Sequence, residues 1–351
     1  MTKKTILFLD NTYPEPYQLV TLKQQAIGGT EASIVKTAAI LSSRYHVIVA
    51  QKFRNEVTIE HEDLHFIPKK DMYTLQIDFI IVLRKYPLLK KLQQKFPTAR
   101  LFLWLHTYKN IEYVFKRRGL AKTNTTVICN SKTHRNDTDR LLNLTILAKS
   151  FSIFIKKTRV KFCYNPISKP QEIHLQETHL KELDYKKDEN KLLFFSSPNK
   201  GLQQVLDCFE YINKELPDLR LYIANPGYKI DHSFKLNKNI IVLGSLPHEE
   251  MMTHVKESLC VFYPQDTFAE TFGLIYAEAN SYGVPVLAHD IGSAREILDK
   301  NNQLVDARDY QQIIQVIKKW QKKYPKISYE DAFSDERVLQ QWRKLLGSVQ
   351  A

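Results

Sequence analysis

The sequence has few cysteines, no long apolar run and no glycine-rich dinucleotide motif. Its four cysteines are far apart and form no C-x-x-C pair, so neither a zinc site nor a disulfide framework is indicated. No segment approaches the ~18 consecutive apolar residues that a membrane-spanning helix needs. The apolar run at residues 6–9 is too short for a signal peptide. The four are Cys129, Cys163, Cys208 and Cys260, and three of them lie in strand-like runs, where reduced core thiols are expected. We therefore expect a cytoplasmic protein.

Acidic residues are scarce in the first half of the chain. Residues 1–166 contain 28 Lys+Arg against 12 Asp+Glu, whereas the remainder contains 23 against 26. The first half therefore has a net charge of +16 and the rest −3, which gives the total of +13. Such an asymmetry points to an anionic partner, such as nucleic acid, a membrane surface or a phosphorylated acceptor. A lysine-rich composition with solvated surfaces accounts for part of the excess.

The chain is long enough for two domains, and strand-like runs alternate with helical patterns along it. At 351 residues it exceeds the size at which a single core stops growing. The apolar runs are short and nearly continuous, which is typical of strands buried on both faces of a parallel sheet. The predicted strands are residues 5–9, 46–50, 78–83, 100–105, 126–129 and 160–164, then 191–195, 219–224, 240–243, 259–263, 284–288 and 303–305.

Helical patterns lie between most of these strands. They include residues 30–43, 201–216, 247–257 and 271–282. The polar segment 168–190 is interpreted as a linker and the entry to the second domain. Residues 329–349 form an amphipathic pattern with Phe333, Val338, Leu339, Trp342 and Leu345 or Leu346 near one stripe. The alternation predicts two doubly wound α/β domains in tandem, whose ligands bind at the carboxyl ends of the strands.

The most informative segment is residues 262–297, in which seven residues separate Glu270 from Glu278. A helix that begins near Thr271 would present the free amides of Phe272, Gly273 and Leu274 to an anion such as a pyrophosphate. If the whole span were helical, the two glutamates would lie roughly 12 Å apart along the axis. Two glutamates alone would be better explained as an ordinary helix surface.

The whole segment closely resembles the E-x7-E signature of family 4 retaining glycosyltransferases, which have the GT-B fold. The match includes Tyr-Pro before the glutamates and Tyr-Gly-Val-Pro-Val after them. The resemblance implies that Glu270 contacts the donor hexose and that Glu278 contacts the ribose hydroxyls of the nucleotide. It also implies a front-face displacement, in which the donor phosphate helps to deprotonate the acceptor and no protein nucleophile attacks the sugar.

Other matches to this family follow in the expected order. Gly28-Gly29, within Gly28-Gly29-Thr30-Glu31, resembles the glycine pair at which the backbone approaches the donor phosphates. His106 follows an apolar strand and matches a histidine beside the donor sugar. Lys200, before Gly201, matches the lysine that neutralises the departing diphosphate. Many family members also have an arginine five residues before this lysine, where Phe195 stands here. The hydroxyl groups that could act in its place belong to Ser196 and Ser197.

Three further motifs are interpreted as structural. Asn130-Ser131 and Asn165-Pro166-Ile167 fit the family, and we expect turn and cap roles for them. Asp137-Thr138-Asp139 has the D-x-D pattern that binds metal in the other glycosyltransferase fold, but it lies in a polar helical stretch far from the donor motif. We therefore expect a solvated helix face and no metal. The leaving-group charge is then left to Lys200 and backbone amides.

We accordingly expect a GT-B protein with two Rossmann-like domains that face each other across a cleft. Residues 1–167 would bind the acceptor and residues 168–328 the nucleotide sugar, and residues 329–351 would form a helix that returns to the first domain. The catalytic candidates are Glu270, His106 and Lys200. The donor-binding candidates are Gly28, Gly29, Ser196, Ser197, Lys200, Glu270, Thr271, Phe272, Gly273, Leu274 and Glu278.

The expected reaction is metal-independent hexose transfer from a nucleotide diphosphate sugar to a glycan or lipid-linked acceptor, in polysaccharide or lipopolysaccharide synthesis. Basic segments at 116–118 and 156–159, with Tyr113, Phe115, Phe151 and Phe154 nearby, suit peripheral attachment to the inner face of an anionic membrane. Two alternatives remain open. A nucleotide-sugar epimerase or hydrolase shares the fold, and a nucleic-acid-binding protein would explain the pI of about 9.3, although the sequence contains no recognised module of that kind.

Overall fold

The computed structural model describes residues 3–143, 157–168, 187–225 and 237–347. The chain divides into two units. The first consists of Met1–Val20, Thr30–Pro166 and Asp335–Ala351, and the second of Thr21–Gly29 and Ile167–Ser334. The sequence does not predict that the short segment Thr21–Gly29 belongs with the second unit. Of the expected linker 168–190, residues 169–186 lie outside the described residues, and its last three residues are part of a strand.

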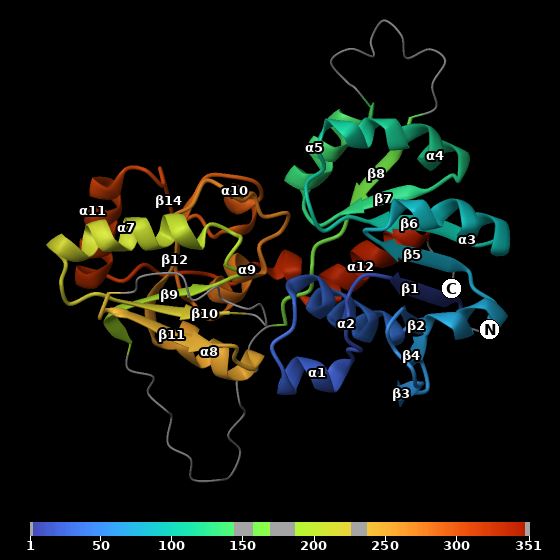
Figure 1. The fold of residues 1–351 in the computed structure, drawn as a ribbon, viewed down its shortest axis with the longest axis horizontal. Coiled ribbons are helices and arrows are strands. Elements are labelled where there is room, and N and C mark those ends of the chain that lie inside the picture. The colour runs from blue at the N-terminus through green and yellow to red at the C-terminus, as the bar shows by residue number, and fades with distance from the viewer. Residues whose placement is uncertain (1–2, 144–156, 169–186, 226–236, 348–351) are drawn as a thin grey trace, which may run out of the picture. The chain divides into compact units, whose positions relative to one another are not determined.

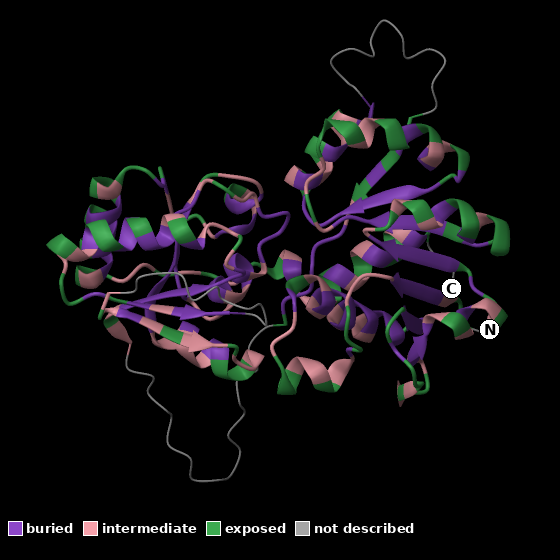
Figure 2. Cartoon of the chain, in the orientation of Figure 1, coloured by how far each residue is buried: buried purple, intermediate pink, exposed green. Residues whose placement is uncertain are grey.

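The first unit contains a sheet in the order β3-β4-β2-β1-β5-β6-β7-β8, parallel throughout except for the antiparallel β3–β4 pair (Figure 1). Its central strands are buried along most of their length, as near-continuous apolar runs require (Figure 2). The strands are β1 (Thr5–Asp10), β2 (His46–Gln51), β3 (Thr58–His61), β4 (Leu64–Pro68), β5 (Phe79–Leu83), β6 (Arg100–Trp104), β7 (Thr126–Cys129) and β8 (Arg159–Phe162).

Helices and 3₁₀ turns connect these strands. They are α2 (Gly29–Ser42), α3 (Leu89–Lys95), α4 (Arg117–Lys122) and α5 (Lys132–Asn143), with the 3₁₀ turns η1 (Lys69–Thr74), η2 (Tyr86–Leu88) and η3 (Ile111–Lys116). Helix α1 (Leu19–Gln24) lies where the first unit passes into the second.

The last helix, α12 (Asp335–Leu346), belongs to the first unit, although it follows every strand of the second. Its Trp342 is fully buried, and the centroid of its ring lies 5.2 Å from that of Trp104 and 6.0 Å from that of Phe8. This packing confirms that the terminal helix returns to the first domain. The helix is shorter than the predicted span 329–349, because the 3₁₀ turn η5 (Asp331–Phe333) precedes it and Gly347 follows at φ +90°. Phe333 is not part of its stripe, since Phe333 belongs to the second unit and packs there against Phe272.

The second unit contains a fully parallel sheet in the order β11-β10-β9-β12-β13-β14. Its strands are β9 (Asp188–Phe195), β10 (Arg220–Ala224), β11 (Ile240–Gly244), β12 (Ser258–Tyr263), β13 (Val286–His289) and β14 (Gln303–Val305). Its helices are α7 (Leu202–Glu215), α8 (His248–Glu257), α9 (Leu274–Ser281), α10 (Ala294–Ile297) and α11 (Tyr310–Lys322). The two parallel α/β units confirm the expected fold class.

Each sheet contains one point at which the strand order reverses. In the first sheet the chain moves outward from β1 to β2 and then continues on the other side of β1 with β5. In the second sheet the reversal lies between β9 and β12. Ligands of open α/β sheets bind beyond the carboxyl ends of the two strands at such a point. The side chains at these two places are therefore the first to inspect for function.

Candidate functional site

An ion pair lies beyond the reversal point of the second sheet. Lys200 follows β9, and Glu270 lies in the loop after β12. The Lys200 ammonium donates to both carboxylate oxygens of Glu270, at 2.8 and 3.1 Å. The Glu270 side chain is only 8% exposed and that of Lys200 is 29% exposed, so the pair is shielded but reachable from solvent. The structure thus brings together two residues that the sequence predicts for the donor site.

Tyr263, the last residue of β12, extends this pair into a buried network. Its hydroxyl donates to Glu270 Oε1 at 3.3 Å and also forms a hydrogen bond with Ser196. Burial, followed by the charge of Glu270, raises the pKa of Tyr263 far above its usual value, so the hydroxyl stays protonated as a donor. Ser196 and Ser197 are both buried just beyond the end of β9, as is Phe195, the last residue of that strand. The sequence analysis counted Tyr263 within the matching Tyr-Pro pair but assigned it no role.

A second missed residue, Gln265, organises the loop that leads to Glu270. Its side chain is 1% exposed, and Oε1 accepts hydrogen bonds from the amides of Thr267 and Phe268 at 3.0 and 2.7 Å. Its Nε2 donates to the Phe268 carbonyl at 2.8 Å. Gly201, before α7, is at φ +87°, and a Cβ there would lie 2.6 Å from Cβ of Gln265. The loop and the start of α7 are therefore closely packed.

Helix α9 begins at Leu274, three residues later than predicted. Gly273 precedes it at φ +76°, a left-handed conformation that ends any helical path from Thr271. Glu270 therefore lies outside the helix, and the helical spacing of the two glutamates does not apply. Thr271 and Phe272 are buried, and the Phe272 ring packs edge-on against Phe333 with centroids 5.1 Å apart.

Glu278 lies within α9, and its side chain is 12% exposed. His248 Nε2, at the start of α8, lies 3.9 Å from Glu278 Oε1. The predicted glycine pair meets the other end of α9. Gly28 is buried, and a Cβ on Gly29 would lie 3.0 Å from Cδ1 of Leu274. The glycine pair therefore lies against the first residue of α9.

His106, the third catalytic candidate, belongs to the first unit and follows β6. Its ring packs against Trp104 with centroids 4.5 Å apart, and Asn130 Nδ2 lies 3.4 Å from His106 Nδ1. Burial lowers the pKa of His106 well below its usual value, and the charge of Arg84 lowers it further. The imidazole is therefore neutral at neutral pH.

The motifs interpreted as structural have structural partners. Ser131 Oγ accepts a hydrogen bond from the His134 amide at 3.1 Å, and Asn130 Oδ1 accepts one from Trp104 Nε1 at 2.6 Å. In the D-x-D segment on α5, Asp137 pairs with Arg140 at 3.6 Å. Asp139 accepts a hydrogen bond from Asn143 Nδ2 at 2.8 Å. Asn165 is buried.

Within the described residues, no group of three or more His, Cys, Asp or Glu side chains is placed to hold a metal ion. The helices among those residues are too short or too polar to cross a bilayer. In the basic segment 116–118, Lys116 and Arg118 are exposed but Arg117 is buried, contrary to an all-exposed basic face. The segment starting at Lys156, together with Phe151 and Phe154, begins outside the described residues.

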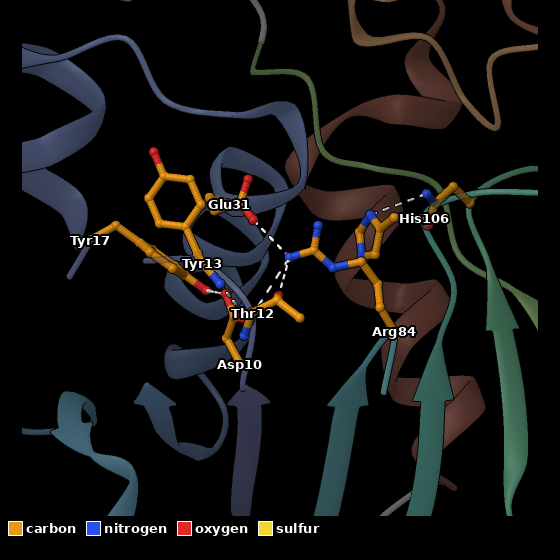
Figure 3. Close-up of polar contacts among 8 residues, drawn as sticks. Asp10, Thr12, Tyr13, Tyr17, Glu31, Arg84 and His106 are labelled. Carbon is orange, nitrogen blue, oxygen red and sulfur yellow. Dashed lines mark hydrogen bonds and ion pairs between the residues drawn. The ribbon is translucent and has the colours of Figure 1, made fainter. Parts of the chain in front are cut away.

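A charged cluster that the sequence did not reveal lies at the reversal point of the first sheet (Figure 3). Arg84 follows β5, and its Nη2 donates to Glu31 Oε1 at 2.9 Å and to Thr12 Oγ1 at 2.6 Å. The same nitrogen lies 3.9 Å from Oδ1 of Asp10, the last residue of β1. The one sequence signal for this cluster is Glu31, two residues after the glycine pair, because Asp10 and Arg84 resemble ordinary strand ends.

The chain was compared with protein-family models, curated proteins and solved structures. Residues 176–332 match the family model described as glycosyl transferases group 1. The crystal structure of Anabaena HepE in complex with UDP and glucose is similar over 99% of this chain and 100% of that chain. Its TM-score is 0.64 at 16% identity.

Two curated proteins are similar over parts of their length. An uncharacterized 41.2 kDa protein in the cps region of Klebsiella pneumoniae is 24% identical over 218 residues, which are 60% of this chain and 56% of that protein. The phosphatidylinositol N-acetylglucosaminyltransferase GPI3 subunit of Saccharomyces cerevisiae is 30% identical over 109 residues, 29% of this chain and 23% of that protein. This chain thus spans about half of the first relative and under a quarter of the second. It has the GT-B fold, and its residues 176–332 match the model of group 1 glycosyl transferases.

Proposed function

We propose that this protein is a retaining glycosyltransferase that moves a hexose from a nucleotide diphosphate sugar to a glycan or lipid-linked acceptor. The observation that carries the proposal is the shielded Lys200–Glu270 pair beyond the reversal point of the second sheet, within the segment that matches group 1 glycosyl transferases. A buried carboxylate and a half-buried ammonium so placed can bind sugar hydroxyls and phosphates at the same time.

In this proposal the residues of the second unit bind and orient the donor. The Lys200 ammonium has three N–H donors and uses two on Glu270, so the third can reach a phosphate oxygen. Glu270, held by Tyr263, accepts from a hexose hydroxyl, and Glu278 accepts from the ribose. The backbone at Gly28, Gly29 and Gly273 provides close approach for the diphosphate. The mechanism assigns no role to a metal ion.

The proposed step is a front-face displacement. The bond from the sugar C1 to the diphosphate oxygen breaks while a bond from C1 to the acceptor oxygen forms on the same face. The acceptor proton passes to the departing diphosphate, whose added charge Lys200 and the backbone amides stabilise. His106 is proposed to lie beside the donor sugar, where a neutral imidazole can donate or accept a hydrogen bond.

A UDP-sugar is the first donor to test, because the similar HepE structure contains UDP and glucose. A role in cell-surface polysaccharide synthesis is proposed from the similarity to a protein of the cps region in Klebsiella. A UDP-sugar present at a hundredfold excess over its Kd should stabilise the fold by about 2.7 kcal/mol, which a thermal-shift screen detects.

The donor site is tested with Glu270→Ala and Lys200→Ala. Each should lower the rate of UDP release from the donor by roughly 10- to 150-fold, because each removes hydrogen bonds to a charged group. Far-UV circular dichroism should be unchanged. Arg220→Ala provides a matched control, since it removes an exposed ion pair to Asp188 at the amino end of the same sheet. Rates like wild type in both donor-site variants would refute the assignment. Conversion of the donor without any acceptor would indicate an epimerase or hydrolase instead.

A further inference from the structure

Arg84 lies where an open α/β sheet binds its ligand. β1 and β5 are neighbours at the reversal point of the first sheet, and Asp10 and Arg84 stand at their carboxyl ends. The donor residues proposed above occupy the equivalent place in the second sheet. The first reversal point is therefore a second candidate binding place, and its chemistry is set by the side chains around Arg84.

The backbone of Arg84 has an unusual conformation. Its φ is +58°, in the left-handed region that non-glycine residues seldom adopt. Its amide donates to the Trp104 carbonyl at 3.0 Å, and the next amide, of Lys85, donates to the Leu83 carbonyl at 2.6 Å. Left-handed arginine persists only where surrounding structure enforces it, and such positions concentrate at ligand sites.

Asp10 has a structural role in the cluster, and its carboxylate is not available to a ligand. It is 2% exposed, and its Oδ1 accepts from the amide and hydroxyl of Thr12 at 2.8 and 2.6 Å. Its Oδ2 accepts from the Tyr17 hydroxyl at 2.9 Å. These donors satisfy the carboxylate within the protein.

Only some of the N–H donors of the Arg84 guanidinium form hydrogen bonds within the described residues. Its Nη2 is held by Glu31 and Thr12, which fixes the plane of the guanidinium. Within the described part of the chain, Nη1 makes no hydrogen bond, and Nε is buried without a partner. The side chain is 26% exposed. Figure 3 shows one nitrogen facing Glu31 and Thr12 and another pointing away from Asp10. A positioned guanidinium with a spare donor at the surface is suited to a carboxylate or phosphate.

A second cation lies nearby. Lys109 Nζ donates to Thr107 Oγ1 at 2.7 Å and lies 5.6 Å from the centre of the Tyr113 ring. Lys109 lies in the loop after β6, the strand that pairs with β5, and the Arg84 amide is bonded to Trp104 at the end of β6, so both cations lie at the same end of the sheet. Burial, and then the charge of Arg84, lower the pKa of Lys109. Two cations at one end of a sheet attract an anion.

We propose that Arg84 and Lys109 bind an anionic group, a carboxylate or a phosphate, on the sugar acceptor. Glu31 orients the guanidinium and partly neutralises it, so it weakens anion binding while it fixes the geometry. The acceptor class is thus an acidic or phosphorylated sugar. The assignment to an acceptor rests on the proposed function, whereas the anion site itself does not.

The test uses small soluble probes and the full chain saturated with UDP, which occupies the donor site. Binding of D-glucuronate, D-glucose 6-phosphate and neutral D-glucose is measured by NMR titration. We expect one or both anions to bind and glucose to bind at least tenfold more weakly. Arg84→Gln should weaken anion binding by roughly 10- to 100-fold, and Lys109→Gln by a smaller factor. Comparison of glucuronate with the phosphate separates the two anionic groups.

Two further variants separate binding from folding. Glu31→Gln keeps an oxygen for Arg84 and removes the competing charge, so anions should bind several-fold more tightly, which mere loss of structure would not produce. Lys85→Gln removes an exposed charge beside Arg84 and should change nothing. Equal binding of glucuronate, the phosphate and glucose, or anion binding that is unaffected by Arg84→Gln and Lys109→Gln, overturns the proposal. Failure of the proposed function appears separately, as absence of UDP binding and UDP-sugar turnover.

Discussion

His134 lies near the start of α5, where its Nδ1 accepts a hydrogen bond from the Asn130 amide at 3.3 Å. The side chain is fully buried, and desolvation lowers its pKa to about 4. His106 in the same unit is shifted in the same direction by burial and by Arg84. Both imidazoles are therefore neutral in the folded state at pH 6, whereas unfolded histidine has a pKa near 6.5.

This shift predicts acid sensitivity. Between pH 6.5 and pH 4 the unfolded state binds more protons than the folded state, so the free energy of unfolding falls as pH falls. His134 should account for up to about 3 kcal/mol of that loss, because each pKa unit corresponds to about 1.36 kcal/mol. Urea unfolding at pH steps from 7 to 4 measures this fall in the free energy of unfolding.

His134→Asn should flatten this pH dependence, since the amide oxygen can take the place of Nδ1 and does not titrate. His61→Asn, which removes an exposed histidine of the same unit, should leave the slope unchanged. An undiminished slope in His134→Asn would show that other groups cause the acid sensitivity.

Individual candidate site residues could be named from the sequence mainly where a long motif surrounds them. Glu270 and Lys200 could be named because the segments around them match a known pattern, and the structure joins them in one ion pair. Arg84 has no such context, and Gln265 lies within the matching segment but was given no role there. Arg84 stands out by its positive φ and Gln265 by its hydrogen bonds to the loop backbone. Neither feature can be predicted from the hydropathy pattern.

At the scale of elements, apolar runs buried on both faces were reliable signals. All twelve predicted strands are present, with ends that differ by at most a few residues. The strands that were missed, β3 and β4, form an edge hairpin in which β3 alternates between half-buried and exposed residues. β4 contains His65 and ends at Pro68, so its pattern resembled a loop.

The predicted start of α9 was wrong because an apolar helical pattern does not show which residue has a positive φ. Gly273 at φ +76° sets the true start, and a Cβ there would lie 2.4 Å from Cδ2 of the buried Tyr276 ring. Gly283, just beyond the same helix, is at φ +71° with no atom within 4 Å of such a Cβ. The two glycines therefore share a backbone conformation but differ in the space around them.

Alanine substitutions separate these two effects. Gly283→Ala should lower the free energy of unfolding by about 1 kcal/mol, the cost of a left-handed alanine. Gly273→Ala should cost about 1–3 kcal/mol more, because the Tyr276 ring must move. It should also weaken UDP binding, which Gly283→Ala should preserve. Urea unfolding and UDP titration measure both quantities. Equal losses of stability would mean that the contact with Tyr276 does not matter.

At the scale of the whole molecule, the positive charge is concentrated in the first half of the chain, with +16 against −3 beyond it. In that half, two large apolar side chains of η3 are exposed, Ile111 by 68% and Phe115 by 81%. Lys116 and Arg118 follow them at the surface. Exposed apolar groups beside cations suit the headgroup region of an anionic bilayer. We therefore propose peripheral membrane attachment through Ile111, Phe115, Lys116 and Arg118, named here the η3 surface.

The η3 surface should hold the protein on anionic but not on neutral vesicles. Each basic residue near an anionic bilayer contributes about 1 kcal/mol within a Debye length of ~8 Å, so attachment should be lost near ~0.5 M salt. Phe115→Ser, and separately the pair Lys116→Gln and Arg118→Gln, should each reduce co-sedimentation while donor turnover stays unchanged. Ile59→Ser is the matched control, because Ile59 is 62% exposed on β3, outside the η3 surface. Absence of pelleting with anionic vesicles at low salt would favour a soluble acceptor, and the charge asymmetry would then be compositional.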